Sequence, residues 1–122
     1  MKIGHWTYHT IIDYQDYFGF TYKITCSVNN KWYIGSKFFR VKCGQKGKYR
    51  KEDWLDYTGS SKTLNADITK YGKDKFTFTI LALHTTRREL HYEEARTIMV
   101  SNALLDINSY NEWVNLKCRY KK

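Results

Sequence analysis

The feature that most constrains the fold is a pair of β-like runs separated by two asparagines. Residues 20–27 alternate β-branched or aromatic side chains with polar ones, and residues 31–36 form a second such run with Gly35 near its end. Asn29-Asn30 supplies a turn between them, because asparagine tolerates a positive φ. The pattern predicts a β-hairpin that places Tyr22 and Tyr33 close together on paired strands.

Two helices and a third strand are predicted after this hairpin. Residues 62–71 follow a serine cap and stop at Gly72, which indicates a helix. Residues 76–83 alternate as a strand does, and a Thr-x-x-Glu capping box opens a longer helix over 87–104. The order β-β-α-β-α predicts an α+β fold: a small three-stranded antiparallel sheet flanked by helices.

The chain length of 122 residues favours one domain. We expect an N-terminal appendage at 1–19, a catalytic or binding domain at 20–112 and a basic C-terminal tail at 113–122. The start of the chain lacks the apolar core of a signal peptide, and no apolar run is long enough to cross a bilayer. Three cysteines without paired spacing favour a reduced, cytoplasmic compartment.

The net charge of +9 makes nucleic acid the leading class of partner, because basic proteins gain affinity for polyanions through counterion release. A membrane surface is the rival, but no basic amphipathic helix with a clean apolar face is visible. Residues 37–52 hold seven cations against one acid. These candidate nucleic-acid contacts are Lys37, Arg40, Lys42, Lys46, Lys48, Arg50 and Lys51. The alternative is a solvated loop without function.

Glu94 and the hairpin tyrosines each allow two interpretations. On the predicted second helix, Glu94 falls between Leu90 and Ile98, one turn before and after it. A carboxylate so placed either reaches solvent beside the core or holds a metal ion. Tyr22 and Tyr33 are either packing residues with hydroxyls at the rim or phenols of a phosphodiester-cleaving site. A phenol with an ordinary pKa of about 10 needs nearby cations to ionise at neutral pH.

The stretch "TYKIT…NNKWYIG" resembles the paired motif of the GIY-YIG nuclease superfamily, although "GFTY" stands where the first motif requires Gly-Ile-Tyr. "YTGSSKTLNADITKYGKDKFTFTIL" resembles the middle helix and third strand of phage-encoded members. "LHYEEARTI" resembles the helix that bears the metal-binding glutamate, and "SYN" resembles the late Tyr-Asn element. The resemblance covers about residues 20–112 and implies a DNA endonuclease that uses one divalent ion, Mg²⁺ or Mn²⁺.

The resemblance also implies roles for four residues. Tyr22 would act as the base or orient the attacking water, with Tyr33 as its partner. Glu94, rather than Glu93, would be the metal ligand, and Asn111 a supporting polar contact.

One element of the family pattern, an arginine, aligns with no single position of this chain. Many members carry an arginine on a helix soon after the second tyrosine motif, and the basic segment stands there in this chain. Arg40 is the nearest candidate and Arg50 the alternative, while Lys37 could also contact phosphate. If neither arginine reaches the site, turnover would be weak or the protein would bind without cutting.

Three functions follow as hypotheses. The first is a metal-dependent endonuclease of phage type, homing-like or DNA-degrading, which acts on double-stranded DNA in a bacterial host cytoplasm. The second is a non-catalytic nucleic-acid-binding module with the same fold. The third is a basic phage protein that binds a host protein. Without a separate recognition domain in the sequence, low specificity or assembly as a homodimer is expected.

Overall fold

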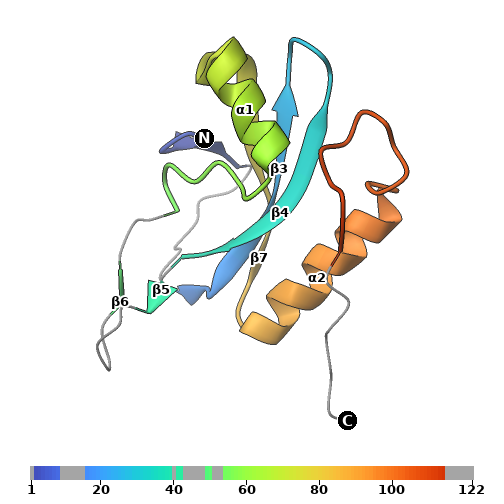
Figure 1. The fold of residues 1–122 in the computed structure, drawn as a ribbon. Coiled ribbons are helices and arrows are strands. Elements are labelled where there is room, and N and C mark those ends of the chain that lie inside the picture. The colour runs from blue at the N-terminus through green and yellow to red at the C-terminus, as the bar shows by residue number, and fades with distance from the viewer. Residues whose placement is uncertain (1, 9–15, 40, 43–48, 51–53, 115–122) are drawn as a thin grey trace.

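The computed structural model describes residues 2–8, 16–39, 41–42, 49–50 and 54–114. The predicted helix at 62–71 and the three predicted strands are present, each within two residues of its expected bounds. The elements, shown in Figure 1, are β1 (Lys2–Ile3), β2 (Trp6–Thr7), β3 (Gly19–Cys26), β4 (Trp32–Phe38), β5 (Val41–Lys42), β6 (Tyr49–Arg50), α1 (Lys62–Tyr71), a 3₁₀ turn (Lys73–Lys75), β7 (Phe76–His84) and α2 (Arg87–Val100).

The main sheet is larger than the three-stranded antiparallel sheet that the sequence predicts. It has five strands in the order β1-β2-β7-β3-β4, and a separate pair joins β5 to β6. β3 pairs antiparallel with β4 and β7, as predicted, but β2 pairs parallel with β7. The sheet is therefore mixed. The added strands have two residues each, too few to show alternation in the sequence.

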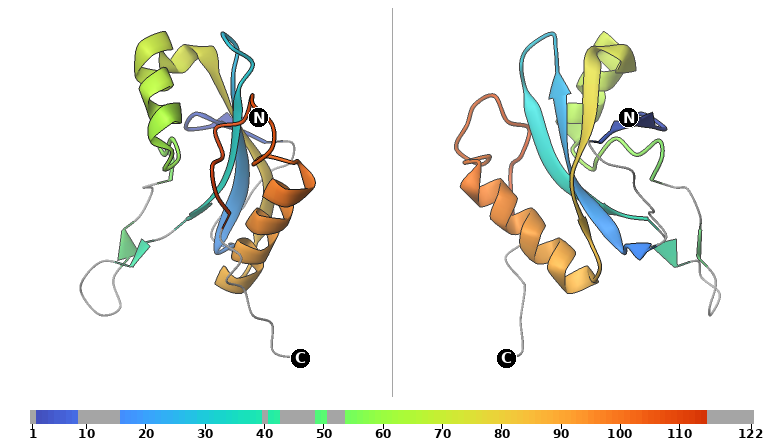
Figure 2. Two further views of the ribbon diagram at one scale, coloured as in Figure 1. Left: turned by 45° about the vertical axis from the view of Figure 1, so that its right-hand side comes forward. Right: turned by 180° about the vertical axis from the view of Figure 1, so that it is seen from behind.

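The two helices lie on opposite faces of this sheet (Figure 2). The face beneath α1 carries a large aromatic core, into which β2 contributes the fully buried Trp6. The Trp6 indole nitrogen donates to the backbone oxygen of Trp54 at 2.7 Å, which ties the N-terminal strands to the loop before α1. The core cluster is Trp6, Phe20, Tyr22, Ile24, Cys26, Phe39, Trp54, Leu64, Phe76, Phe78, Ile80 and Tyr110.

Helix α2 begins where the capping box predicts but ends four residues earlier than expected. The hydroxyl of Thr86 accepts a hydrogen bond from the Glu89 backbone, so the predicted N-cap is confirmed. At the other end Asn102 adopts φ 56°, and the Ala103 N–H bonds to the Ile98 carbonyl. This bond across a left-handed residue is a Schellman motif, which stops the helix. Neither described helix is long and apolar enough to cross a membrane.

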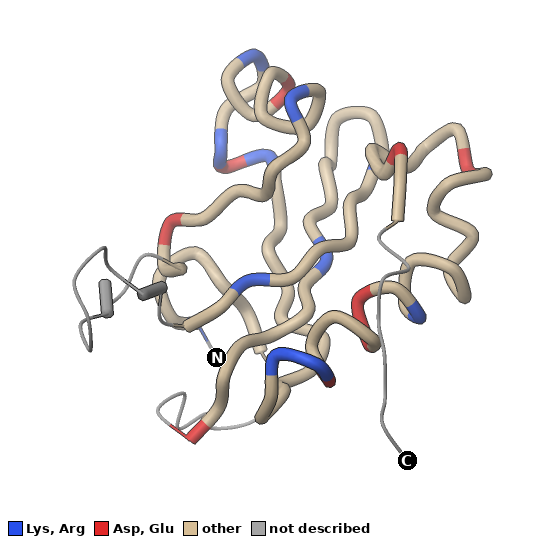
Figure 3. The backbone as a smooth tube through the Cα atoms, turned by 60° about the horizontal axis from the view of Figure 1, so that its bottom comes forward, with Lys and Arg blue, Asp and Glu red and all other residues tan. Residues whose placement is uncertain are grey.

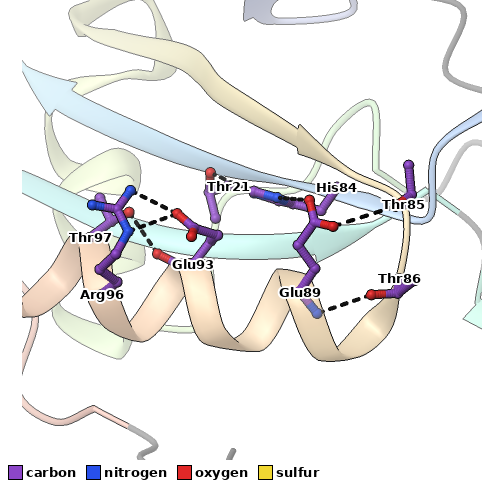
Figure 4. A network of polar contacts seen from close by, with 8 residues as sticks. All are labelled: Thr21, His84, Thr85, Thr86, Glu89, Glu93, Arg96 and Thr97. Carbon is purple, nitrogen blue, oxygen red and sulfur yellow. Dashed lines mark hydrogen bonds and ion pairs between the residues drawn. The ribbon is translucent and has the colours of Figure 1, made fainter. Parts of the chain in front are cut away.

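Buried polar groups anchor the start of α2 to the sheet (Figure 4). His84 is 3% exposed, and its ring lies between the Thr21 hydroxyl and the Glu89 carboxylate, at 3.2 Å from each. Glu89 also accepts from Thr85 at 3.4 Å. The imidazole thereby links β3, β7 and α2, and it holds the helix that carries Glu94 against the sheet.

Candidate active site

The two hairpin tyrosines lie on the α1 face of the sheet, as their strand register requires. Tyr22 pairs with Gly35, and Tyr33 lies two residues before that glycine, so all three share one face. The Tyr22 and Tyr33 ring centroids are 6.2 Å apart. A Cβ atom on Gly35 would overlap the Tyr22 hydroxyl. The glycine of the Tyr-Ile-Gly motif thus makes room for the phenol of the neighbouring strand.

A third tyrosine completes this cluster. Tyr57 packs edge-on against Tyr22 with 6.1 Å between ring centroids, and the two hydroxyls share a hydrogen bond. The Lys37 ammonium nitrogen lies 4.4 Å from the Tyr57 ring centroid. The Ser60 hydroxyl is 3.3 Å from the Tyr33 hydroxyl. Lys37, expected to contact phosphate, is therefore placed beside the tyrosines.

Burial controls the ionisation of all three phenols. It raises the pKa of Tyr22 well above the usual value, and the nearby Tyr33, Tyr57 and Glu94 add to the rise. Burial also raises the pKa of Tyr33 and Tyr57, although hydrogen bonds from Ser60 partly oppose it. Each phenol is consequently neutral at pH 7 unless a further cation approaches it.

Glu94 approaches the same region from the opposite face of the sheet. Ser36 follows Gly35 on β4 and points toward α2, where its hydroxyl donates to a Glu94 carboxylate oxygen at 2.8 Å. Burial raises the pKa of Glu94, while the Ser36 hydrogen bond and the charge of His91 lower it. The serine therefore fixes the carboxylate at the edge of β4, partly withdrawn from solvent.

Asn111 binds the exposed edge of β4. Its side-chain oxygen accepts from the Ile34 N–H at 2.9 Å, and its amide nitrogen donates to the Ile34 carbonyl at 2.8 Å. These two bonds replace the pairing that a neighbouring strand would give to this edge. Tyr110 adds a bond from its N–H to the Trp32 carbonyl at 2.7 Å. The segment after α2 is thereby fastened along β4.

Tyr33, Glu94 and Asn111 line one open pocket of about 540 Å³ at the β4 edge. The start of α1 and the segment after α2 flank this edge on its two sides (Figure 1). Tyr22 is only 1% exposed, so Tyr33 is the motif phenol that a ligand in the pocket would meet first. Three of the five predicted catalytic residues are therefore brought to one cavity, and the fourth, Tyr22, packs against Tyr33.

Most of the predicted basic contacts lie beyond what the structure describes. Arg40, Lys46, Lys48 and Lys51 fall outside the described residues, and Lys42 and Arg50 are placed only by their backbones in β5 and β6. The described Lys and Arg are spread over α1, α2 and the sheet (Figure 3).

Three polar residues of the site were not predicted from the sequence. Ser36 and Ser60 orient Glu94 and Tyr33, and Tyr57 joins the tyrosine cluster. Ser36 follows directly after the Tyr-Ile-Gly motif, and strand alternation alone would have placed it on the face of Glu94. No strand or helix periodicity marks Ser60 or Tyr57, because both belong to an irregular loop.

Comparison with known proteins gives one family. Residues 6–117 match the family model described as "Putative endonuclease segE, GIY-YIG domain". Comparison with curated proteins gave no match, and comparison with solved structures gave none either. The family match covers most of the chain and includes the hairpin, both helices and the Tyr-Asn segment. The chain therefore belongs to the GIY-YIG nuclease superfamily.

Proposed function

We propose that this protein is an endonuclease that hydrolyses phosphodiester bonds of double-stranded DNA with a divalent ion. The observation that supports the proposal most is the convergence of Tyr33, Glu94 and Asn111 on one pocket, in a chain of a nuclease superfamily. A phage origin, with action in a bacterial cytoplasm, belongs to the same proposal.

The side chains at the pocket suit a hard divalent ion such as Mg²⁺ or Mn²⁺. Glu94 offers a partly buried carboxylate that accepts one hydrogen bond from Ser36, which leaves oxygen lone pairs for an ion. Among the described residues, no three His, Cys, Asp or Glu side chains gather as a metal site. A single carboxylate fits Mg²⁺, which keeps several waters and takes further ligands from substrate phosphate. When bound, the ion would stabilise negative charge on the phosphoryl oxygens.

The phenols would hold and deprotonate the attacking water. Because burial raises the pKa of Tyr33, this phenol is neutral in the free protein. It accepts a proton only as phenolate, a form that positive charge near the pocket favours. The resemblance implies Tyr22 as the base, but Tyr22 is only 1% exposed, so the proposal gives this role to Tyr33. Tyr22 and Tyr57 would keep the Tyr33 ring in place, and Arg40 remains the proposed partner of the phosphate.

Cleavage of supercoiled plasmid tests this proposal. We expect nicking with MgCl₂ or MnCl₂ and none in EDTA. Glu94→Gln should lower the rate about 10²- to 10³-fold, as loss of one electrostatic contact to the reacting group does. Glu93→Gln is the matched control, because Glu93 lies one residue away and pairs with Arg96 at 2.7 Å. Equal rates for the two variants would refute the role of Glu94.

Binding without cleavage is the second candidate function. Lys62 is the one cation among the residues that line the pocket, and all of its lining residues belong to the described part of the chain. Without an arginine at the phosphate, the site would bind nucleic acid and turn over little. Salt-sensitive DNA binding with no cutting under any divalent ion would establish this function instead.

A further inference from the structure

Trp113 is exposed at the site, unlike the buried tryptophans of the core. Its side chain is 71% exposed, whereas Trp6 and Trp54 are at most 1% exposed. It lines the same pocket as Tyr33 and Glu94. A tryptophan exposed to this degree keeps most of its apolar surface in solvent, so packing within the fold does not account for its position.

The pocket has a polar part and an apolar part. The start of α1 contributes the hydroxyls of Ser60, Ser61 and Thr63 and the ammonium of Lys62. Ile98 and the C-terminal segment contribute apolar surface, with Trp113 beside Val114. Hydroxyls and an ammonium suit phosphate, and an indole face suits a flat ring. A nucleotide carries both groups.

The charge of the protein indicates which flat ring binds. A net charge of +9 favours a polyanion over an apolar peptide, and nucleobases are the rings that such a partner carries. In an intact duplex each base face is covered by its neighbours in the stack. An indole can therefore stack only on a base that has left the helix or belongs to a single strand.

We infer that Trp113 is a stacking platform for an unpaired nucleobase of the strand that crosses the pocket. The inference rests on the proposed function, and it specifies the substrate as DNA with an unstacked base close to the phosphate that is cut. Trp113 acts in binding, and it has no part in the proton transfers of the reaction.

Binding to two matched strands in EDTA tests this inference without any cleavage. One is a labelled single-stranded DNA oligonucleotide, and the other has the same length with tetrahydrofuran abasic residues in place of its nucleotides. Both carry the same phosphates, so only the bases differ. We expect Trp113→Ala to raise the Kd for the first strand about 5- to 150-fold, given about 1–3 kcal/mol for a base–aromatic stack. On the abasic strand its Kd should equal that of the wild type.

Two further variants separate stacking from other effects. Trp113→Phe keeps an aromatic face and should bind close to the wild type. Tyr92→Ala removes a different aromatic side chain, 48% exposed on α2 and outside the pocket lining, and should change neither Kd. Direct contact is checked by fluorescence: the base-bearing strand should protect wild-type emission from acrylamide, and this protection should vanish in Trp113→Phe.

The inference is overturned if Trp113→Ala leaves the Kd for the base-bearing strand unchanged, or if it weakens binding to the two strands equally. It is also overturned if the wild type binds neither strand. Plasmid cleavage by the wild type separates the two proposals: cleavage with any of these results removes only the stacking role. Failure of the wild type both to cleave and to bind removes the proposed function as well.

Discussion

The two faces of the central sheet differ in chemistry. The face under α1 is a continuous aromatic core in which Trp6, Phe20 and Trp54 contact one another. The face under α2 has a smaller apolar cluster, formed by Ile34, Ile98 and Ala103, and it also buries polar groups such as His84. The first face supplies most of the apolar burial, and the second carries the carboxylate of the candidate site.

The difference shows how one small sheet can serve both stability and chemistry. Partly buried carboxylates and phenols are costly to hold, because burial disfavours their ionised forms. At the edge of β4 the tyrosines come from the face under α1 and Glu94 comes from the face under α2, so both faces contribute residues to the site. Substitutions on the two faces should consequently differ in the size and even the sign of their effect on stability.

The largest expected loss of stability comes from Trp6→Ala. The substitution empties a fully buried site, removes aromatic contacts with Phe20 and Tyr22 and breaks the hydrogen bond to Trp54. We expect the free energy of unfolding to fall by about 3–5 kcal/mol, measured by urea denaturation.

Trp113→Ala is the matched control for this prediction. The side chain is 71% exposed, so its loss should change stability by less than about 0.5 kcal/mol. A small effect of Trp6→Ala, equal to that of the control, would mean that the N-terminal strands are not part of the core.

A smaller loss is expected on the α2 face, from His84→Ala. The imidazole bridges Thr21 and Glu89, and its removal leaves the buried Thr21 hydroxyl without that partner. We expect a loss of about 1–3 kcal/mol in the free energy of unfolding. Glu89→Gln, which keeps an acceptor for the ring, should lose less. If His84→Ala matched the wild type, this polar network would not anchor α2.

Tyr110→Phe tests how strongly the segment after α2 is held to α1. The Tyr110 hydroxyl donates to Asp67 on α1 at 2.6 Å and lies 3.3 Å from the Asn29 amide. Burial and the bond to Asp67 raise the pKa of Tyr110, so the hydroxyl remains a neutral donor. We expect a loss of about 0.5–1.5 kcal/mol by thermal denaturation. No loss in Tyr110→Phe, with a loss in Asp67→Asn, would assign the stabilisation to another partner of Asp67.

The sequence predicts the central hairpin and α1 well, because both have strong local signals. Asn29-Asn30 sits between alternating runs, and Ser61 and Gly72 bracket the helix. The sequence does not predict the strands around Trp6. These strands have two residues each, too few to show a pattern, and β2 pairs with β7 only through a long-range contact. The end of α2 was predicted too late, because Asn102 in a left-handed conformation is a weaker stop signal than glycine.

The candidate site was likewise predicted only in part from the sequence. The family motif leads to Tyr22, Tyr33, Glu94 and Asn111, and three of these line the pocket. The motif does not indicate that Asn111 uses both amide atoms on the Ile34 backbone, or that Ser36 holds Glu94. Such contacts depend on which segment lies against an exposed strand edge, and one sequence carries no local signal for that. The roles of Arg40 and Arg50 stay predictions.

The smallest and most telling change in stability is that of Glu94→Gln. Because burial raises the pKa of Glu94, ionisation of this carboxyl destabilises the folded state once the pH exceeds its usual pKa in the unfolded chain. The variant should therefore be slightly more stable than the wild type at pH 7, whereas a typical substitution loses about 1 kcal/mol. The gain should disappear below about pH 4.3, where the carboxyl is protonated in both states.

The most direct test of the central claim measures unfolding and plasmid cleavage on the same metal-free preparations of wild type, Glu94→Gln and Glu93→Gln, with Mg²⁺ added only for the cleavage assay. The claim is that Glu94 is held at the β4 edge for chemistry rather than for stability. It predicts that Glu94→Gln gains stability at pH 7 and loses cleavage, while Glu93→Gln keeps its cleavage. A Glu94→Gln variant that is less stable than the wild type and still cuts DNA at the wild-type rate would contradict it.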